Sequence, residues 1–190
     1  MLAPFPTPQP TLTTARLTLR PFTLADAPDV ARHVSMREIA EMTLHIPHPY
    51  PEDGAAAWIG ERAASYAEGK TVNFAVALRD DGTLVGSIGL VLEPDHHRAE
   101  IGYWIGKPYW GRGYATEAGQ AVLGFGFETL GLNKIHAAHF TKNPSSGRVL
   151  EKLGMTYEGC LREHDYKWGV YEDIKVYAVL AREWAARRSG

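Results

Sequence analysis

The stretch YWGRGYATEA, residues 109–118, places two glycines around an arginine between two different kinds of segment. It follows the apolar run IGYWI (101–105) and precedes a run that favours a helix. Glycine loses the most conformational freedom on folding, so the pair predicts a turn that side chains would block. A strand, a glycine turn and a helix point backbone N–H groups and the positive end of a helix dipole at an anion. The expected donors are the amides of Gly111, Arg112, Gly113, Tyr114 and Ala115.

Several kinds of site have glycines between a strand and a helix. A P-loop needs a Lys-Ser/Thr pair after its second glycine, whereas Tyr114 and Ala115 follow Gly113. A dinucleotide fingerprint needs a glycine where Thr116 stands, and an acidic residue after the next strand, which the segment at 134–140 lacks. A cradle for the diphosphate of coenzyme A, with the pantetheine arm along the neighbouring strand, and a plain tight turn both stay open.

Composition sets the broad class of the protein. A chain of 190 residues is most simply one domain, able to bury about 70% of its unfolded surface. The formal net charge of −2 gives no indication of a strongly basic face that would bind nucleic acid. Cys160, the single cysteine, cannot form an intrachain disulfide, which fits a reducing compartment. With neither a signal-peptide pattern nor a membrane-length apolar run, we expect a cytoplasmic protein with no membrane partner.

The periodicity of apolar residues predicts an α/β (α+β) domain over residues 14–190, after a proline-rich arm over residues 1–13. The expected elements, in order, are a strand at 16–22, helices at 23–34 and 55–69, strands at 73–79, 83–92 and 99–105, a helix at 116–130, a strand at 134–140, a helix at 143–154, and strands at 156–162 and 173–180. Helices that alternate with strands favour a mixed sheet, antiparallel in its hairpins and parallel where a helix crosses over.

The segment KPYWGRGYATEA (107–118) resembles motif A of the GNAT N-acyltransferases, with Trp110 where Gln or Arg is usual. That substitution, with Thr116-Glu117-Ala118 after it, is typical of the branch that contains the ribosomal-protein N-terminal acetyltransferases. The likeness covers nearly the whole chain: it includes TARLTLRPFTLADA (14–27), NPSSGRVLEKLGM (143–155), EGCLR (158–162), Gly169, Asp173 and the final EW (183–184). The resemblance implies the GNAT fold, a mixed, mostly antiparallel sheet of about seven strands with about four helices.

The same resemblance implies direct transfer of an acetyl group from acetyl-coenzyme A to a primary amine, without a metal. The loop amides, the backbone of Trp104 and Ile105, and Asn143 would bind the donor. A protein N-terminal α-amine is the first expectation for the acceptor, and a polyamine or antibiotic amine is the alternative. The segments 35–52 and 163–172 would select it, through the acidic and aromatic residues Glu38, Glu41, Tyr50, Asp165, Tyr166 and Trp168. A homodimer fits the family.

Two residues are the candidates for proton transfer. Glu100 begins the strand beside the loop and would be the base that takes the amine's proton. Burial near the apolar run at 101–105 would raise its pKa toward a useful range. The alternative is that Glu100 is a solvent-facing strand residue with no catalytic role. Many GNAT enzymes use a tyrosine as the acid at the position that Leu150 occupies here. Ser146 is the acid that remains, although a serine there also suits a helix start, and Asn143 has the same second role.

Other chemistry has less support in the sequence. Cys160 lacks the context of a nucleophilic cysteine. His136 and His139 lie three apart in a strand and point to opposite faces, so no metal site is expected. Two rival classes remain: a non-catalytic acyl-coenzyme A-binding module, which the missing tyrosine keeps open, and a nucleotide-binding or interaction domain whose glycine turn is fortuitous.

Overall fold

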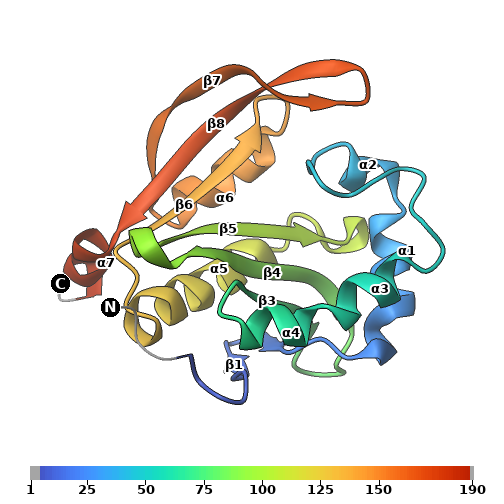
Figure 1. The fold of residues 1–190 in the computed structure, drawn as a ribbon, viewed down its shortest axis with the longest axis horizontal. Coiled ribbons are helices and arrows are strands. Elements are labelled where there is room, and N and C mark those ends of the chain that lie inside the picture. The colour runs from blue at the N-terminus through green and yellow to red at the C-terminus, as the bar shows by residue number, and fades with distance from the viewer. Residues whose placement is uncertain (1–4, 189–190) are drawn as a thin grey trace.

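An eight-stranded sheet organises the fold, in the order β1-β2-β3-β4-β5-β6-β8-β7 (Figure 1). The structure is a computed structural model, and it describes residues 5–188. The strands are β1 (Leu12–Thr13), β2 (Leu17–Arg20), β3 (Thr71–Leu78), β4 (Leu84–Glu93), β5 (Arg98–Ile105), β6 (Lys134–Phe140), β7 (Thr156–Lys167) and β8 (Val170–Leu180). The α-helices are α1 (Ala27–Val34), α2 (Arg37–Ala40), α3 (Gly54–Gly60), α4 (Arg62–Ala67), α5 (Tyr114–Gly124), α6 (Pro144–Lys152) and α7 (Ala181–Arg188).

The central strands β5 and β6 form the parallel pair of this sheet, and the other neighbouring strands pair antiparallel. Their pairing covers only three positions and ends where Glu100 meets His136. Beyond that point β5 continues to Ile105 and β6 to Phe140 along diverging paths, as Figure 1 shows. The C-terminal part of β5, from Ile101 to Ile105, therefore has no strand paired to it on the β6 side.

Helices cover both faces of the sheet. Ala118 and Val122 of α5 and Leu150 of α6 pack with the sheet residues Ile88 and Leu90 in the main core. On the opposite face, a second cluster joins α1 and α3 to the sheet through Val30, Val34, Ala55, Ile59, Ala75 and Leu84. Because β-strand side chains alternate between faces, each central strand contributes to both layers.

The predicted order of strands and helices is confirmed, with differences at several boundaries. The predicted helix at 55–69 is two helices, α3 and α4, joined at Glu61. The helix expected at 116–130 begins two residues earlier, at Tyr114, and its C-terminal turn over Phe125–Thr129 is π-helical. The earlier start has a clear cause, since Gly113 has a φ of 80° and serves as the N-cap residue.

The ends of the sheet differ most from the prediction. The arm predicted at 1–13 contributes the short strand β1, which brings the sheet to eight strands where about seven were expected. Residues 1–4 of this arm lie outside the described part. The two C-terminal strands extend to a long hairpin, with its turn at Gly169 as expected. Strand β7 is the sheet edge and exposes most of its residues, so its polar sequence gave no alternating signal beyond residue 162. The short helices α2 and α7 were not predicted.

Candidate active site

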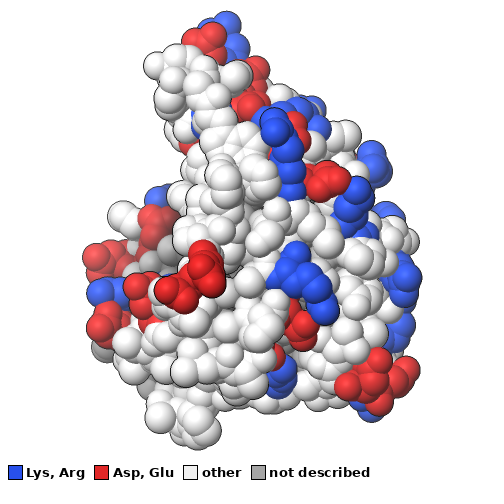
Figure 2. All heavy atoms as spheres, turned by 90° about the vertical axis from the view of Figure 1, so that its right-hand side faces the viewer, with Lys and Arg blue, Asp and Glu red and all other residues white. Residues whose placement is uncertain are grey.

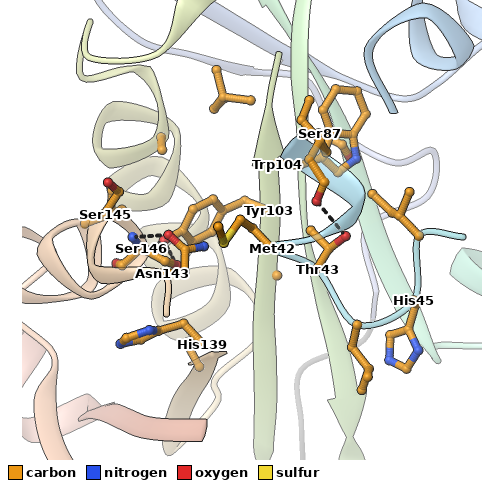
Figure 3. A pocket seen from close by; sticks show the side chains of 18 of the residues that line it. Met42, Thr43, His45, Ser87, Tyr103, Trp104, His139, Asn143, Ser145 and Ser146 are labelled. Atoms are coloured by element: carbon orange, nitrogen blue, oxygen red, sulfur yellow. Dashed lines mark hydrogen bonds between the residues drawn. The ribbon is translucent and has the colours of Figure 1, made fainter. Parts of the chain in front are cut away.

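A cavity of about 940 Å³ opens where β5 and β6 separate. Its lining includes the glycine loop, the first turns of α5 and α6, the strand β5, and the segment from Ile39 to Pro51. Figure 3 shows Thr43, His45 and Trp104 on one side of the cavity and Asn143, Ser145 and Ser146 on the other. The cavity therefore joins two chemically different walls, one built on α5 and α6 and one built on the segment after α2.

The glycine loop adopts the conformation that its sequence predicts. Gly111 and Gly113 have φ values of 75° and 80°, in the left-handed region that other residues avoid. Both glycines line the cavity, with Tyr114, Ala115 and Thr116 after them at the start of the eleven-residue helix α5. The first N–H groups of a helix have no intrahelical partner, and here they face a cavity. This arrangement fits an anionic group such as a diphosphate.

Trp110 ties the loop to the end of β5. Its indole Nε1 donates a hydrogen bond to the carbonyl of Ile105, at 2.5 Å. Trp104 and Ile105 both line the cavity, on the part of β5 that has no partner on the β6 side. A free strand edge can pair with the amides of an extended ligand, as predicted for the pantetheine arm.

A second anchor holds the loop from the N-terminal side. Glu117, in the first turn of α5, accepts hydrogen bonds from Thr14 Oγ1 at 2.6 Å and from the Arg16 backbone N and Nε at 2.8 and 2.7 Å. Burial acts to raise the pKa of Glu117, but these hydrogen bonds lower it below its usual value. Arg16 also donates to the Arg112 carbonyl at 3.0 Å and lies over the Tyr114 ring. The Arg16–Glu117 ion pair thus fixes the loop and neutralises a carboxylate beside the anion site.

Ser146 lies at the start of α6, where it could serve the helix start, act as the acid, or do both. Its backbone N–H donates to Asn143 Oδ1 at 3.1 Å, which confirms Asn143 as the N-cap. Its hydroxyl is not used in the cap and lies 2.7 Å from the hydroxyl of Tyr103. Both Ser146 and Asn143 line the cavity, as Figure 3 shows.

Tyr103 lies against Ser146, and no role in proton transfer was predicted for it from the sequence. Burial raises its pKa to about 12, although the hydrogen bond with Ser146 acts in the opposite direction. The expected tyrosine position holds Leu150, which is fully buried in the core. Strand alternation could have indicated Tyr103, because it shares a face of β5 with the buried Ile101, toward α5 and α6. The phenol reaches Ser146 from a strand and not from a helix.

Glu100 lines the cavity, and of the two environments considered from the sequence, the structure shows the solvent-facing one. It is exposed, on the face of β5 that alternates with the core residues Ala99 and Ile101. Its neighbour across the parallel pair is His136, which is half-buried and has no hydrogen-bond partner on Nδ1 among the described residues. Burial lowers the pKa of His136, while the charge of Glu100 acts to raise it. Glu100 therefore stands at the cavity beside an imidazole that is neutral at pH 7.

The two segments predicted to select the acceptor meet above the cavity. The structure places three of their residues in the lining, Glu38, Tyr50 and Asp165, and the other three, Glu41, Tyr166 and Trp168, outside it. Lys167, at the end of β7, donates hydrogen bonds to the carbonyls of Thr43, Leu44 and Ile46. This lysine, which sequence reasoning also missed, joins the hairpin to the segment after α2.

The remaining sequence expectations concern other kinds of site. Cys160 is exposed on β7 and does not line the cavity. Within residues 5–188, no group of three or more metal-binding side chains comes together. In the same range, no helix has the length and apolar character that a membrane crossing requires.

On the face drawn in Figure 2, lysines and arginines lie mainly along the right-hand edge, and carboxylates lie mainly on the left, with others at the top and lower right. Lys142 before α6, Arg148 within α6 and Lys152 at its last position line the cavity. Lys142 pairs with Glu172, and Arg148 donates to Ser145 Oγ at 2.8 Å. The wall built on α6 is thus cationic, which suits a phosphorylated ligand.

Comparison with known proteins agrees with this geometry. A family model described as an acetyltransferase (GNAT) domain matches residues 16–156. The uncharacterized N-acetyltransferase YoaA of Bacillus subtilis (strain 168) is 36% identical over 172 residues, which cover 90% of this chain and 97% of that protein. The putative ribosomal N-acetyltransferase YdaF of the same organism is 37% identical over 109 residues, 57% of this chain and 60% of that protein.

A solved structure gives the same result for the fold. The crystal structure of a GNAT-family acetyltransferase from Bacillus anthracis is similar with a TM-score of 0.83 and 29% identity, covering 92% of this chain and 100% of that one. The matched region contains the glycine loop, the free edge of β5 and the start of α6. The chain therefore belongs to the GNAT family and is an N-acetyltransferase whose donor is acetyl-coenzyme A.

Proposed function

We propose that the enzyme acetylates a protein N-terminal α-amine by direct attack within a ternary complex. The observation that carries direct transfer is the shared cavity: Ser146, on the wall proposed to bind the donor, and the carboxylate Glu100 line the same space. Cys160, the single cysteine, lies outside this lining, so no thiol there could carry the acetyl group. The likeness to YdaF, which is named a putative ribosomal N-acetyltransferase, supports the N-terminal acceptor.

Donor binding falls to the loop and to β5. The backbone amides of Gly111, Arg112, Gly113, Tyr114 and Ala115 would bind the diphosphate, aided by the dipole of α5. The backbone of Trp104 and Ile105, together with Asn143, would contact the pantetheine arm. An N–H group on the free edge of β5 would also stabilise the oxyanion that forms during transfer.

Glu100 is proposed as the base that takes the proton from the attacking amine, directly or through a water. General base catalysis contributes about 10²- to 10⁴-fold to a rate. The variant Glu100→Gln should therefore lower kcat at neutral pH by at least about 100-fold while acetyl-coenzyme A binding changes little. A comparable loss in both quantities would contradict the assignment.

Ser146 is proposed to protonate the leaving thiolate. Tyr103 has a pKa of about 12 and so keeps its proton at neutral pH. Its hydroxyl can donate to Ser146 Oγ, which leaves the serine proton free to point at the sulfur. A Ser146→Ala enzyme with wild-type turnover would remove this role.

Thiol release from acetyl-coenzyme A over a panel of N-terminal peptides, polyamines and aminoglycosides tests the acceptor class. Preferred turnover of the peptides supports the proposal, and preferred turnover of the other amines assigns a small-molecule substrate instead. Binding of acetyl-coenzyme A with no thiol release for any amine would indicate a non-catalytic module. The homodimer stays a prediction that light scattering would test. The cytoplasmic location stays a prediction that cell fractionation would test.

A further inference from the structure

Gly102 leaves a stretch of bare backbone in the wall of the cavity. It lies on β5 between Glu100 and Trp104, on the same face as both, and all three line the cavity. A Cβ atom added at Gly102 would meet no atom within 4 Å, so packing does not require glycine here. Glycine weakens a strand interior and often marks a place where a ligand approaches closely. The space above Gly102 is therefore open, and a ligand could lie directly against its backbone.

The walls around this space are mainly apolar and aromatic. Val34 of α1 and Met42, Leu44 and Ile46 of the following segment line the same cavity, with Tyr50 and Trp58 also in its lining. Burial raises the pKa of Tyr50, which keeps its hydroxyl neutral. These side chains suit an apolar body, because burying such surface is favourable.

Few carboxylates are available to a cationic acceptor. Among the described residues, the cavity is lined by three: Glu38, Glu100 and Asp165. Glu38 is already paired with Lys107 at 2.6 Å. Asp165 lies on the β7–β8 hairpin opposite Glu172, so Glu100 is the carboxylate next to Gly102 on β5. Polyamines and aminoglycosides carry several ammonium groups, and each buried charge without a partner is costly. Glu100, beside Gly102, can serve a single amine.

We infer that the acceptor slot passes over the backbone of Gly102 and takes a primary amine carried on an apolar or aromatic body. The inference rests on the proposed function and narrows it to amines with one cationic group. An N-terminus that begins with an apolar residue and a small arylalkylamine share this chemistry. Gly102 sets the width of the slot, and Glu100 meets the amine.

The test compares Gly102→Leu with Gly60→Leu, a matched control on α3. A Cβ at Gly60 also meets no atom within 4 Å, and Gly60 does not line the cavity. The substrates are peptides that begin with Leu or Asp, 2-phenylethylamine, spermidine and kanamycin. The wild type should turn over the Leu peptide or 2-phenylethylamine with a kcat/KM at least about tenfold above spermidine and kanamycin. Whichever of these two has the higher kcat/KM shows whether the acceptor is a peptide N-terminus or a small arylalkylamine.

Gly102→Leu should lower kcat/KM for the apolar amines about 100-fold, since its side chain fills the slot. The Kd of acetyl-coenzyme A should stay within about threefold, and Gly60→Leu should match the wild type. Preference for spermidine or kanamycin, or wild-type turnover by Gly102→Leu, would overturn the inference.

If no amine releases thiol from the wild type, the proposed function fails. Calorimetric binding of 2-phenylethylamine then still tests the slot. Loss of that binding in Gly102→Leu supports the slot, and undiminished binding or no binding to the wild type overturns it.

Discussion

Removal of the Lys167 ammonium should loosen the wall of the acceptor site. The side chain is only 6% exposed and donates to the carbonyls of Thr43, Leu44 and Ile46, the last two at 3.1 Å. A lysine ammonium has three N–H donors, so these carbonyls use all of its capacity. Burial lowers the pKa of Lys167, and the same burial makes its hydrogen bonds stronger than in water.

Lys167→Met keeps most of the aliphatic chain and removes the donors. Each buried carbonyl left without a donor costs about 1–3 kcal/mol. The variant no longer has to bury a charge, and water can reach some of the carbonyls, so the net loss should be about 2–4 kcal/mol. In a chain of this size, such a loss lowers Tm by about 5–15 °C.

Thermal unfolding and steady-state kinetics together check this prediction. A loosened Thr43–Ile46 segment should raise the KM of the amine about tenfold, because the acceptor is no longer held in place. The KM of acetyl-coenzyme A should not change, since its wall lies on α5 and α6. Lys70→Met is the control, because Lys70 is exposed and paired only with Glu68, and its stability should change by less than about 0.5 kcal/mol. Equal stability of Lys167→Met and wild type would refute the reasoning.

Three further predictions concern the donor side and the core. Arg16→Met should raise the KM of acetyl-coenzyme A about three- to tenfold in steady-state assays, because it frees the loop and leaves an unpaired carboxylate beside the anion site; an unchanged KM contradicts the anchor. Tyr103→Phe should lower kcat about tenfold with an unchanged KM for acetyl-coenzyme A, since Ser146 loses its donor; the wild-type pH–rate profile should show no limb from this phenol below pH 10, as its pKa is about 12. Burial lowers the pKa of His33 and His139 below the usual 6.5, so the unfolded chain binds protons first as the pH falls. The stability that comes from keeping His33 and His139 neutral in the folded protein is complete above pH 6.5 and is lost as the pH falls below it. The urea midpoint of unfolding should therefore be lower at pH 5.5 than at pH 7.5. Equal midpoints at the two pH values would contradict the lowered pKa values of these histidines.

Much of the fold follows from local patterns in the sequence. The strands around Phe74, Ile88, Ile101 and Ile135 were placed within one or two residues, because alternation and turn glycines mark both strand faces and their ends. The long β7–β8 hairpin was underestimated because an exposed edge strand needs no apolar face. Strand β1 was missed because two residues carry no period.

The donor site is likewise a local property of the sequence. The glycine loop and α5 are contiguous, and the positive φ values of Gly111 and Gly113 depend on those residues alone. Backbone N–H groups at a helix start favour the binding of an anion. The segment 109–118 therefore predicts the loop conformation from its own residues, and binding of the donor diphosphate there stays a proposal.

The acceptor side was decided only by the tertiary structure. Lys167 reaches the carbonyl of Thr43 across 124 positions of sequence, and Tyr103 reaches Ser146 across 43. Neither contact has a local signature, because a side chain's partner is set by how strands and helices pack. The exposure of Glu100 and the open space above Gly102 have the same origin, since both depend on where β6 turns away from β5. The sequence determined the conformation of the glycine loop through its own backbone geometry, and the packing of distant elements formed the wall where we propose that the acceptor binds.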